Sequence, residues 1–264
     1  MGVQTQLTLK EAQVLFNAFH IDSLTPTQDG VVDTTYLTKH YVLKHYERKI
    51  DSKIAKDKAL LETLAKASLN TPKHLAHNGS WHLYTRLRGT SPKHTTLMHI
   101  QALARFLAKL HTKTQHLKNH EQFLEQYPIQ ERLSFVKQKF YLYYKKLQTL
   151  QELSLENDGF IHGDIFCDNT LFDGNKIAVF DFIDGGAGSF AFECGVALLA
   201  FNPHKKKSFT KLFLDTYNQK APKKLTYSEV QQQIQNGAKL YALLRICKYG
   251  STKRAKELSK HLIK

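Results

Sequence analysis

The chain has 264 residues, of which 42% are hydrophobic and 23% are charged, and its formal net charge is +15. This length suits one large domain or two lobes that share a cleft. No apolar run reaches the length of a membrane span, and the first ten residues lack a signal-peptide core. Three distant cysteines, Cys167, Cys194 and Cys247, favour free thiols. We therefore expect a cytoplasmic protein without a membrane partner.

Excess positive charge attracts nucleic acids, anionic membranes or phosphorylated metabolites, including ATP. The densest basic run, His204 to Lys207, has no interleaved aromatic residues. Such a run favours a solvated helix start or loop over a nucleic-acid patch. We expect no nucleic-acid partner, and the oligomeric state cannot be read from the sequence.

The first part of the chain is predicted to be a small sheet with one inserted helix. Apolar spacing indicates a short helix from Leu9 to Phe19, and a longer one from Lys53 to Lys66 with Ile54, Leu61, Leu64 and Ala65 on one face. Strands are predicted for Gly30 to Leu37, Tyr41 to Tyr46 and Trp81 to Leu87.

Gly and Pro in the segment 88–92 interrupt both periodicities and indicate a connector. After it, helical spacing dominates from Ile100 to His111 and from Phe123 to Leu153, with a break near Pro128. Strands return around 160–183, and the last 70 residues are helical. The predicted fold is α+β, with an N-terminal lobe at 1–87, a larger, mostly helical C-terminal lobe at 88–264, and a cleft between them.

One short stretch carries the chemistry. Asp173-Gly174-Asn175 predicts a hairpin between two apolar runs, and folding back about Gly174 would bring Asn169 near Asp181. Both residues offer hard oxygen ligands, which suit Mg²⁺ completed by water and phosphate. Asp164 precedes them and could accept a proton from an incoming hydroxyl, as phosphoryl transfer requires. Surface Asp and Asn in hairpin turns are the simpler alternative for each residue alone.

The motif from His162 to Asn169, followed by Asp181-Phe182, resembles the catalytic and metal loops of the aminoglycoside phosphotransferase/choline kinase-like superfamily. The resemblance implies a protein-kinase-like two-lobe fold and transfer of the ATP γ-phosphoryl group to a small-molecule hydroxyl. It implies that Asp164 is the catalytic base, that Asn169 and Asp181 hold Mg²⁺, and that His162 orients the loop. Glu193 would support the catalytic loop without being catalytic.

The same resemblance assigns the nucleotide site. Lys44 would contact the ATP phosphates, with Glu62 on the following helix as its ion-pair partner. The segment 84–87 would be the hinge beside adenine, with Tyr84 and Arg86 among the nucleotide contacts. A turn at 28–36 lacks the multiple glycines of a protein-kinase loop, so Thr34 and Thr35 would cover the phosphates with their hydroxyls.

Within the superfamily, the segments 165–172, 87–92 and 46–50 are similar to the type II homoserine kinase-like group. That similarity implies L-homoserine as the acceptor and a role in threonine biosynthesis, although the chain is short for that group. Choline, an aminoglycoside, another amino alcohol or sugar, or a nucleoside remain alternative acceptors. A catalytically silent kinase-like binding module is the alternative from another class.

Three further patterns suggest other functions, but each lacks a feature that its function requires. The segment 186–191 matches a dinucleotide-binding fingerprint, but no parallel strand with an acidic residue follows it. His116 and His120 have the spacing of zinc ligands but lack a third ligand. Cys167 lies in the catalytic loop without a base to activate it, so we expect it to be a bystander.

Overall fold

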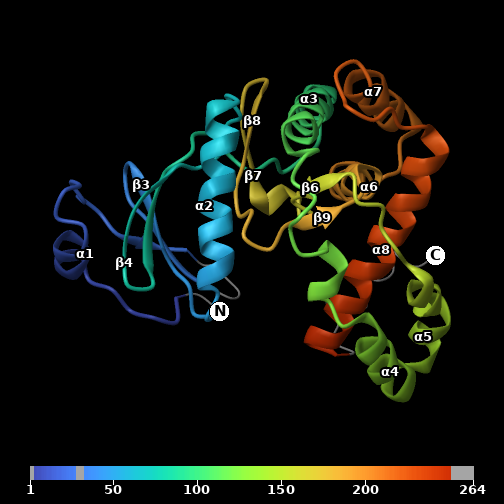
Figure 1. Cartoon of the computed structure of the whole chain (residues 1–264), viewed down its shortest axis with the longest axis horizontal. Helices are drawn as coiled ribbons and strands as arrows, with labels where there is room; N and C mark the ends of the chain where they lie inside the picture. The colour runs from blue at the N-terminus through green and yellow to red at the C-terminus, as the bar shows by residue number, and fades with distance from the viewer. Residues whose placement is uncertain (1–2, 28–32, 251–264) are drawn as a thin grey trace. The chain divides into compact units, whose positions relative to one another are not determined.

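The computed structural model describes residues 3–27 and 33–250 (Figure 1). The chain divides into two compact units, Met1–Thr90 with Ala178–Ile183, and Ser91–Ile177 with Asp184–Lys264. The first unit thus extends slightly past the predicted boundary at 87 and also includes a short segment from late in the sequence. Within the described residues, no helix combines the length and apolar character that a membrane span requires.

The first unit is built on a five-stranded antiparallel sheet with the strand order β1-β2-β3-β5-β4. Its elements are α1 (Leu9–Leu15), β1 (Thr25–Pro26), β2 (Thr34–Leu37), β3 (Tyr41–His45), α2 (Asp51–Lys66), β4 (His74–Asn78) and β5 (Trp81–Thr85). Figure 1 shows α1 and α2 on opposite sides of this sheet. The predicted helices and strands are present, and of the strand predicted at 30–37, residues 30–32 lie outside the described part.

The sequence analysis missed strand β4. Its sequence, His-Leu-Ala-His-Asn, is only weakly β-forming, but it pairs with β5 across a turn at Gly79 and Ser80. Gly79 has φ +56°, which glycine adopts without strain. The dipeptide Asn78-Gly79 is a recognised hairpin signal and could have revealed the strand.

The pleat of the sheet separates an apolar face from a polar face. Leu43, Leu83 and Tyr36 are buried on one face and pack with Ala12 and Phe16 of the α1 region. Successive side chains of a strand point to opposite faces, so the residues next to these point the other way. Cross-strand pairing then places Thr35, Lys44, His82 and Tyr84 together on the polar face, as the pairs Thr35↔Lys44, Lys44↔His82 and Val42↔Tyr84 require.

The second unit is mostly helical, with a few short strands. Its elements are α3 (Leu97–Thr114), η1 (Phe123–Gln126), α4 (Ile129–Lys139), α5 (Tyr141–Leu147), η2 (Gln148–Glu152), β6 (Gly159–Ile161), η3 (Cys167–Asn169), β9 (Gly186–Gly188), α6 (Phe190–Phe201), α7 (Lys207–Tyr217) and α8 (Tyr227–Tyr249). The predicted break at Pro128 is present, because Pro128 is the N-cap of α4. A second break at Phe140 was not predicted.

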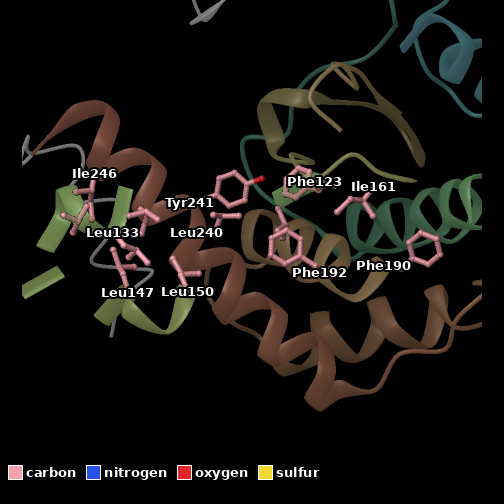
Figure 2. Close-up of a cluster of buried hydrophobic side chains, with 14 residues drawn as sticks. Phe123, Leu133, Leu147, Leu150, Ile161, Phe190, Phe192, Leu240, Tyr241 and Ile246 are labelled. Carbon is pink, nitrogen blue, oxygen red and sulfur yellow. The ribbon is translucent and has the colours of Figure 1, made fainter. Parts of the chain in front are cut away.

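Helices α6 and α8 pack closely because glycines face the partner helix. A Cβ at Gly195 would lie 2.6 Å from the backbone of Gln233, and one at Gly237 would lie 3.0 Å from Val196. Around this pair, fourteen buried side chains form a hydrophobic core cluster of the unit, which Figure 2 shows. Phe123 and Tyr241 of this core contact Gly163, which lies in the predicted catalytic loop.

The segment with the dinucleotide-like glycines has a structural role. Gly186–Gly188 form β9, which pairs antiparallel with β6 in a two-stranded sheet. A Cβ at Gly186 would lie 2.6 Å from the carbonyl oxygen of Glu121, so this segment needs glycine for close backbone packing.

The predicted hairpin is also present, as β7 (Thr170–Asp173) and β8 (Lys176–Val179) form their own two-stranded sheet. Gly174 in its turn has φ +58°.

Candidate active site

The predicted catalytic loop, 162–169 in the second unit, is held in place at Gly163. This residue has φ +76°, and a Cβ there would lie 2.0 Å from the Phe123 ring. Its N–H donates to Glu193 Oε1 at 2.8 Å, and its carbonyl accepts a hydrogen bond from the Tyr241 hydroxyl. Both backbone groups before Asp164 are therefore bound by buried side chains from α6 and α8.

Glu193 connects this loop to the core. The carboxylate is buried and also hydrogen-bonds His111 Nε2 at 2.8 Å, and His111 Nδ1 bonds the Tyr217 hydroxyl at 2.7 Å. The His111 ring stacks on Phe190 with a centroid distance of 4.0 Å. A buried carboxylate with these partners is satisfied and rigid. The contact of Glu193 with Gly163 agrees with its predicted supporting role, which stays a prediction. The contacts of His111 and Tyr241 were not recognised from the sequence.

Asp164 and Asn169 are bound to each other. The Asn169 amide nitrogen donates to the carboxylate Oδ2 of Asp164 at 2.9 Å and to its backbone carbonyl at 2.8 Å. His162, which is buried, accepts the Asp164 N–H at its Nδ1 with a distance of 3.2 Å, as expected for a residue that orients the loop. Because the Asn169 amide group is used in this way, its carbonyl oxygen is the atom that could bind a metal.

Two tyrosines lie in the electrostatic surroundings of Asp164. Burial raises the pKa of Tyr241 and of Tyr127, and the charge of Asp164 raises both further. Nearby guanidinium groups of Arg245 and Arg132 act in the opposite direction on Tyr241 and Tyr127 respectively. Both tyrosines therefore remain protonated near neutral pH and can donate hydrogen bonds beside the carboxylate.

Lys44 and Asp181 form an ion pair in the first unit. Lys44 Nζ lies 2.7 Å from Asp181 Oδ1, and the Asp181 side chain is 41% exposed. Asp181 has φ +68°, an uncommon conformation for a residue with a side chain, which aspartate tolerates better than most. Backbone conformations of this kind often occur at functional sites. Asp181 is thus held in an unusual conformation beside a lysine.

A second carboxylate, that of Asp33, also lies beside Lys44. It is buried, lies 3.8 Å from the Lys44 ammonium and 3.2 Å from Arg48, and accepts the Glu47 N–H. Burial lowers the pKa of Lys44, but Asp181 and Asp33 outweigh it and the net pKa is raised. Lys44 is therefore a stable cation. Asp33 was not predicted, because nothing local marks it as buried.

The structure corrects the prediction that Glu62 pairs with Lys44. Glu62 is on the exposed side of α2, and the described ion pairs of Lys44 go to Asp181 and Asp33 instead. The buried residues of α2 are Asp57, Leu60, Leu61 and Leu64. Asp57, five residues before Glu62, is the acidic residue on the buried face, and its charge raises the pKa of Tyr46 and Tyr84 in addition to burial.

The two predicted phosphate-covering threonines lie on opposite faces of the sheet. Thr34 is fully buried on the α1 side, where its hydroxyl donates to Glu47 at 2.7 Å and accepts the N–H groups of Gln4 and Thr5. The pleat therefore places it away from Lys44, which contradicts its predicted role. Thr35 lies directly opposite Lys44 on the polar face.

The predicted hinge residues differ in environment. Tyr84 is buried, and its hydroxyl hydrogen-bonds the Tyr46 hydroxyl at 2.9 Å. Arg86 is exposed, its backbone N–H donates to the His40 carbonyl at 3.0 Å, and its guanidinium donates to the Thr38 carbonyl.

Cys167 is half-buried, and burial together with the charge of Asp168 raises the pKa of its thiol to about 11, which suits a bystander thiol.

The donor set of the predicted metal site fits magnesium in its chemistry. Asp181 would supply a carboxylate and Asn169 an amide carbonyl, which are hard oxygen ligands, and Mg²⁺ usually takes few protein ligands. Among the described residues no group of three or more His, Cys, Asp or Glu side chains could hold a metal by itself. A metal here would therefore need ligands from the nucleotide or from water.

Solved structures with this fold are kinase-like phosphotransferases. The amicoumacin kinase hAmiN, determined with AMP-PNP and Ca²⁺, matches with a TM-score of 0.72 and 17% identity over 96% of this chain and 90% of that one. The ADP-bound aminoglycoside phosphotransferase APH(2'')-Ib matches with a TM-score of 0.64 and 18% identity over 98% and 100%. The macrolide 2'-phosphotransferase MphH from Brachybacterium faecium matches with a TM-score of 0.65 and 14% identity over 96% and 97%. The α+β protein-kinase-like fold is thereby confirmed.

The family follows from the sequence of the chain itself. Residues 23–225 match the model of the APH phosphotransferase enzyme family. The match covers more than half of the chain, so the protein belongs to this family and is a phosphotransferase. No curated protein matches the chain significantly.

Proposed function

We propose that the protein is an ATP- and Mg²⁺-dependent small-molecule kinase, with L-homoserine as the favoured acceptor. The family supports phosphotransfer, and nucleotides with a divalent metal are present in similar structures such as that of amicoumacin kinase. The motifs shared with the homoserine kinase-like group favour the acceptor.

The hydrogen bond between Asn169 and the Asp164 carboxylate is the observation that carries this proposal. This bond orients the Asp164 carboxylate through Asn169, and Asn169 also offers an oxygen to the metal. One residue therefore serves both the proposed base and the proposed metal site. In the reaction, the acceptor hydroxyl gives its proton to Asp164 while its oxygen forms a bond to the γ-phosphorus and the bond to the ADP oxygen breaks. Fixing Gly163 through Glu193 and Tyr241 lowers the freedom of that carboxylate.

We assign Asn169 and Asp181 as the protein ligands of Mg²⁺. A bound magnesium ion neutralises negative charge on the transferred phosphoryl group. The β7–β8 hairpin separates these two residues in the sequence, and a hairpin returns the chain toward its starting point, which supports a shared ligand. We do not assign Asp164 to the metal.

The nucleotide contacts that we propose are Lys44 for the phosphates, Thr35 beside it, and the segment of Tyr84 and Arg86 near the adenine. Lys44 remains charged because its pKa is raised, and Thr35 lies opposite it in the sheet. We leave Thr34 and Glu62 out of the nucleotide site, since both side chains point elsewhere.

Other acceptors remain alternatives of the same chemistry. Similar structures are named for aminoglycoside, macrolide and amicoumacin substrates, so an antibiotic hydroxyl is a candidate, as are choline and other amino alcohols or sugars. A silent binding module is disfavoured, because Lys44, Asp164, Asn169 and Asp181 are all present and Lys44 and Asp164 are held by hydrogen bonds.

The test is an assay of ATP consumption with Mg²⁺ across L-homoserine, choline, an aminoglycoside, a macrolide and sugars, with the phosphorylated product identified by mass. Asp164→Asn should lower kcat by roughly 10²- to 10⁴-fold, because a general base contributes about that much. Asp168→Asn is the matched control, since Asp168 is an exposed acid in the same loop. Equal activity of the Asp164 variant and wild type would contradict the assigned base. Binding of ATP without turnover of any acceptor would favour the silent module.

A further inference from the structure

The second unit contains a cavity that begins at the catalytic loop. Its volume is about 130 Å³, and Phe166 forms part of its wall two residues after Asp164. Leu198, Leu199 and Ile234 add apolar surface, and Lys205 and Arg245 add two positive charges. No carboxylate is among the described residues that line this cavity. A polycationic ligand would therefore meet only positive charge there.

Arg245 is held beside the catalytic loop. Its guanidinium carbon lies 5.8 Å from the centre of the Phe166 ring, and this ring makes an edge contact with Tyr241 at a centroid distance of 4.9 Å. Tyr241, one turn earlier on α8, hydrogen-bonds Gly163. Both contacts tie the position of Arg245 to the residues that flank Asp164. The positive charge therefore lies beside Phe166, two residues after the proposed base.

Arg245 is half-buried, and within the described part of the chain it makes no ion pair with a carboxylate. Arg132 on α4 resembles it, because its buried Nε has no hydrogen-bond partner among the described residues. Arg132 lies against α8, since the Cys247 thiol contacts its carbonyl at 3.9 Å. Partly buried guanidinium groups without an acidic partner are suited to binding carboxylates or phosphates.

We infer that Arg245 binds an anionic group of the phosphoryl acceptor, a carboxylate or a phosphate, and that this cavity selects anionic acceptors over polycationic ones. The inference rests on the proposed kinase function, because it assigns the acceptor end of that site. Phe166 and the leucines of α6 would contact the carbon chain of the acceptor, while its hydroxyl would point toward Asp164. Polycationic aminoglycosides are then poor substrates.

The experiment measures kcat/KM at saturating ATP and Mg²⁺ for L-homoserine, L-homoserine amide, which lacks the carboxylate, glycerol 3-phosphate, choline and an aminoglycoside. We expect an acceptor with a carboxylate or a phosphate to exceed the acceptors without one at least tenfold. Comparison of L-homoserine with glycerol 3-phosphate distinguishes a carboxylate from a phosphate. Arg245→Met should raise KM for that acceptor about 10- to 100-fold, the effect of losing a charged hydrogen bond, with kcat little changed. On L-homoserine amide, the activities of Arg245→Met and the wild type should differ less than twofold.

Two variants separate the anchoring role from a loss of fold. Arg245→Lys keeps the charge without the planar pair of donors and should fall between wild type and Arg245→Met. Lys248→Met removes an exposed cation from the same helix and should match wild type. Preference of the wild type for acceptors without an anionic group, or equal loss by Arg245→Met on acceptors with and without that group, would overturn the inference.

Failure of the proposed kinase function can be distinguished from failure of the inference about Arg245. If no acceptor is phosphorylated, the kinase proposal fails, and calorimetric titration of the wild type and Arg245→Met with L-homoserine and glycerol 3-phosphate still tests the cavity. Anion binding that depends on Arg245 supports the inference. Absence of such binding overturns it.

Discussion

Replacing Gly163 with alanine should destabilise the second unit and misplace Asp164. The residue has φ +76°, and a left-handed conformation costs about 1–2 kcal/mol for a residue with a Cβ. The new methyl group would also lie 2.0 Å from Phe123 Cε2 and 2.3 Å from its Cζ, and overpacking of a buried ring costs about 1–3 kcal/mol. Together these terms predict a loss of about 2–5 kcal/mol in the free energy of unfolding.

The matched control is Gly174→Ala in the β7–β8 turn. Gly174 has φ +58°, but nothing lies within 4 Å of the position of its Cβ, so only the backbone term of about 1–2 kcal/mol applies. Urea denaturation of both variants measures the difference. Phe123→Leu in combination with Gly163→Ala should recover part of the loss, as a double-mutant cycle would report. Equal destabilisation of the two glycine variants, with no coupling to Phe123, would refute the steric argument.

Two further predictions concern titrating groups. Burial and the neighbouring charges of His74 and His77 lower the pKa of His82 to about 4. Between about pH 6.5 and pH 4 the unfolded chain therefore binds more protons than the folded protein, and the free energy of unfolding decreases as the pH is lowered. Urea denaturation across this range should show a smaller fall for His82→Gln, and an identical profile would contradict the assignment. The Cys167 thiol, with a pKa of about 11, should react with iodoacetamide at pH 7.5 at least about tenfold more slowly than free cysteine. Fast modification, followed by mass spectrometry, would show that the thiol is activated.

The sequence predicted helices and strands correctly, and singled out candidate site residues, where residues close together in the chain determine them. Helical spacing located α2 and α3, and the turn at Gly174 located the β7–β8 hairpin. Asp164 and Asn169 are five residues apart, so the hydrogen bond between them depends mainly on the loop conformation. The weakly β-forming strand β4 was missed, because its pairing with β5 stabilises it more than its own residues do.

Contacts between distant segments could not be read from the sequence. The amino-acid pattern indicated the phosphotransferase family and the α+β fold, and it singled out Asp164, Asn169, Asp181 and Lys44 as the proposed site residues. Tertiary structure alone decided that Lys44 pairs with Asp181 and Asp33, and that Tyr241 reaches the catalytic loop from 78 residues away. The physical reason is that the burial and pairing of a charge depend on which face of a helix or strand it occupies and on what packs against that face.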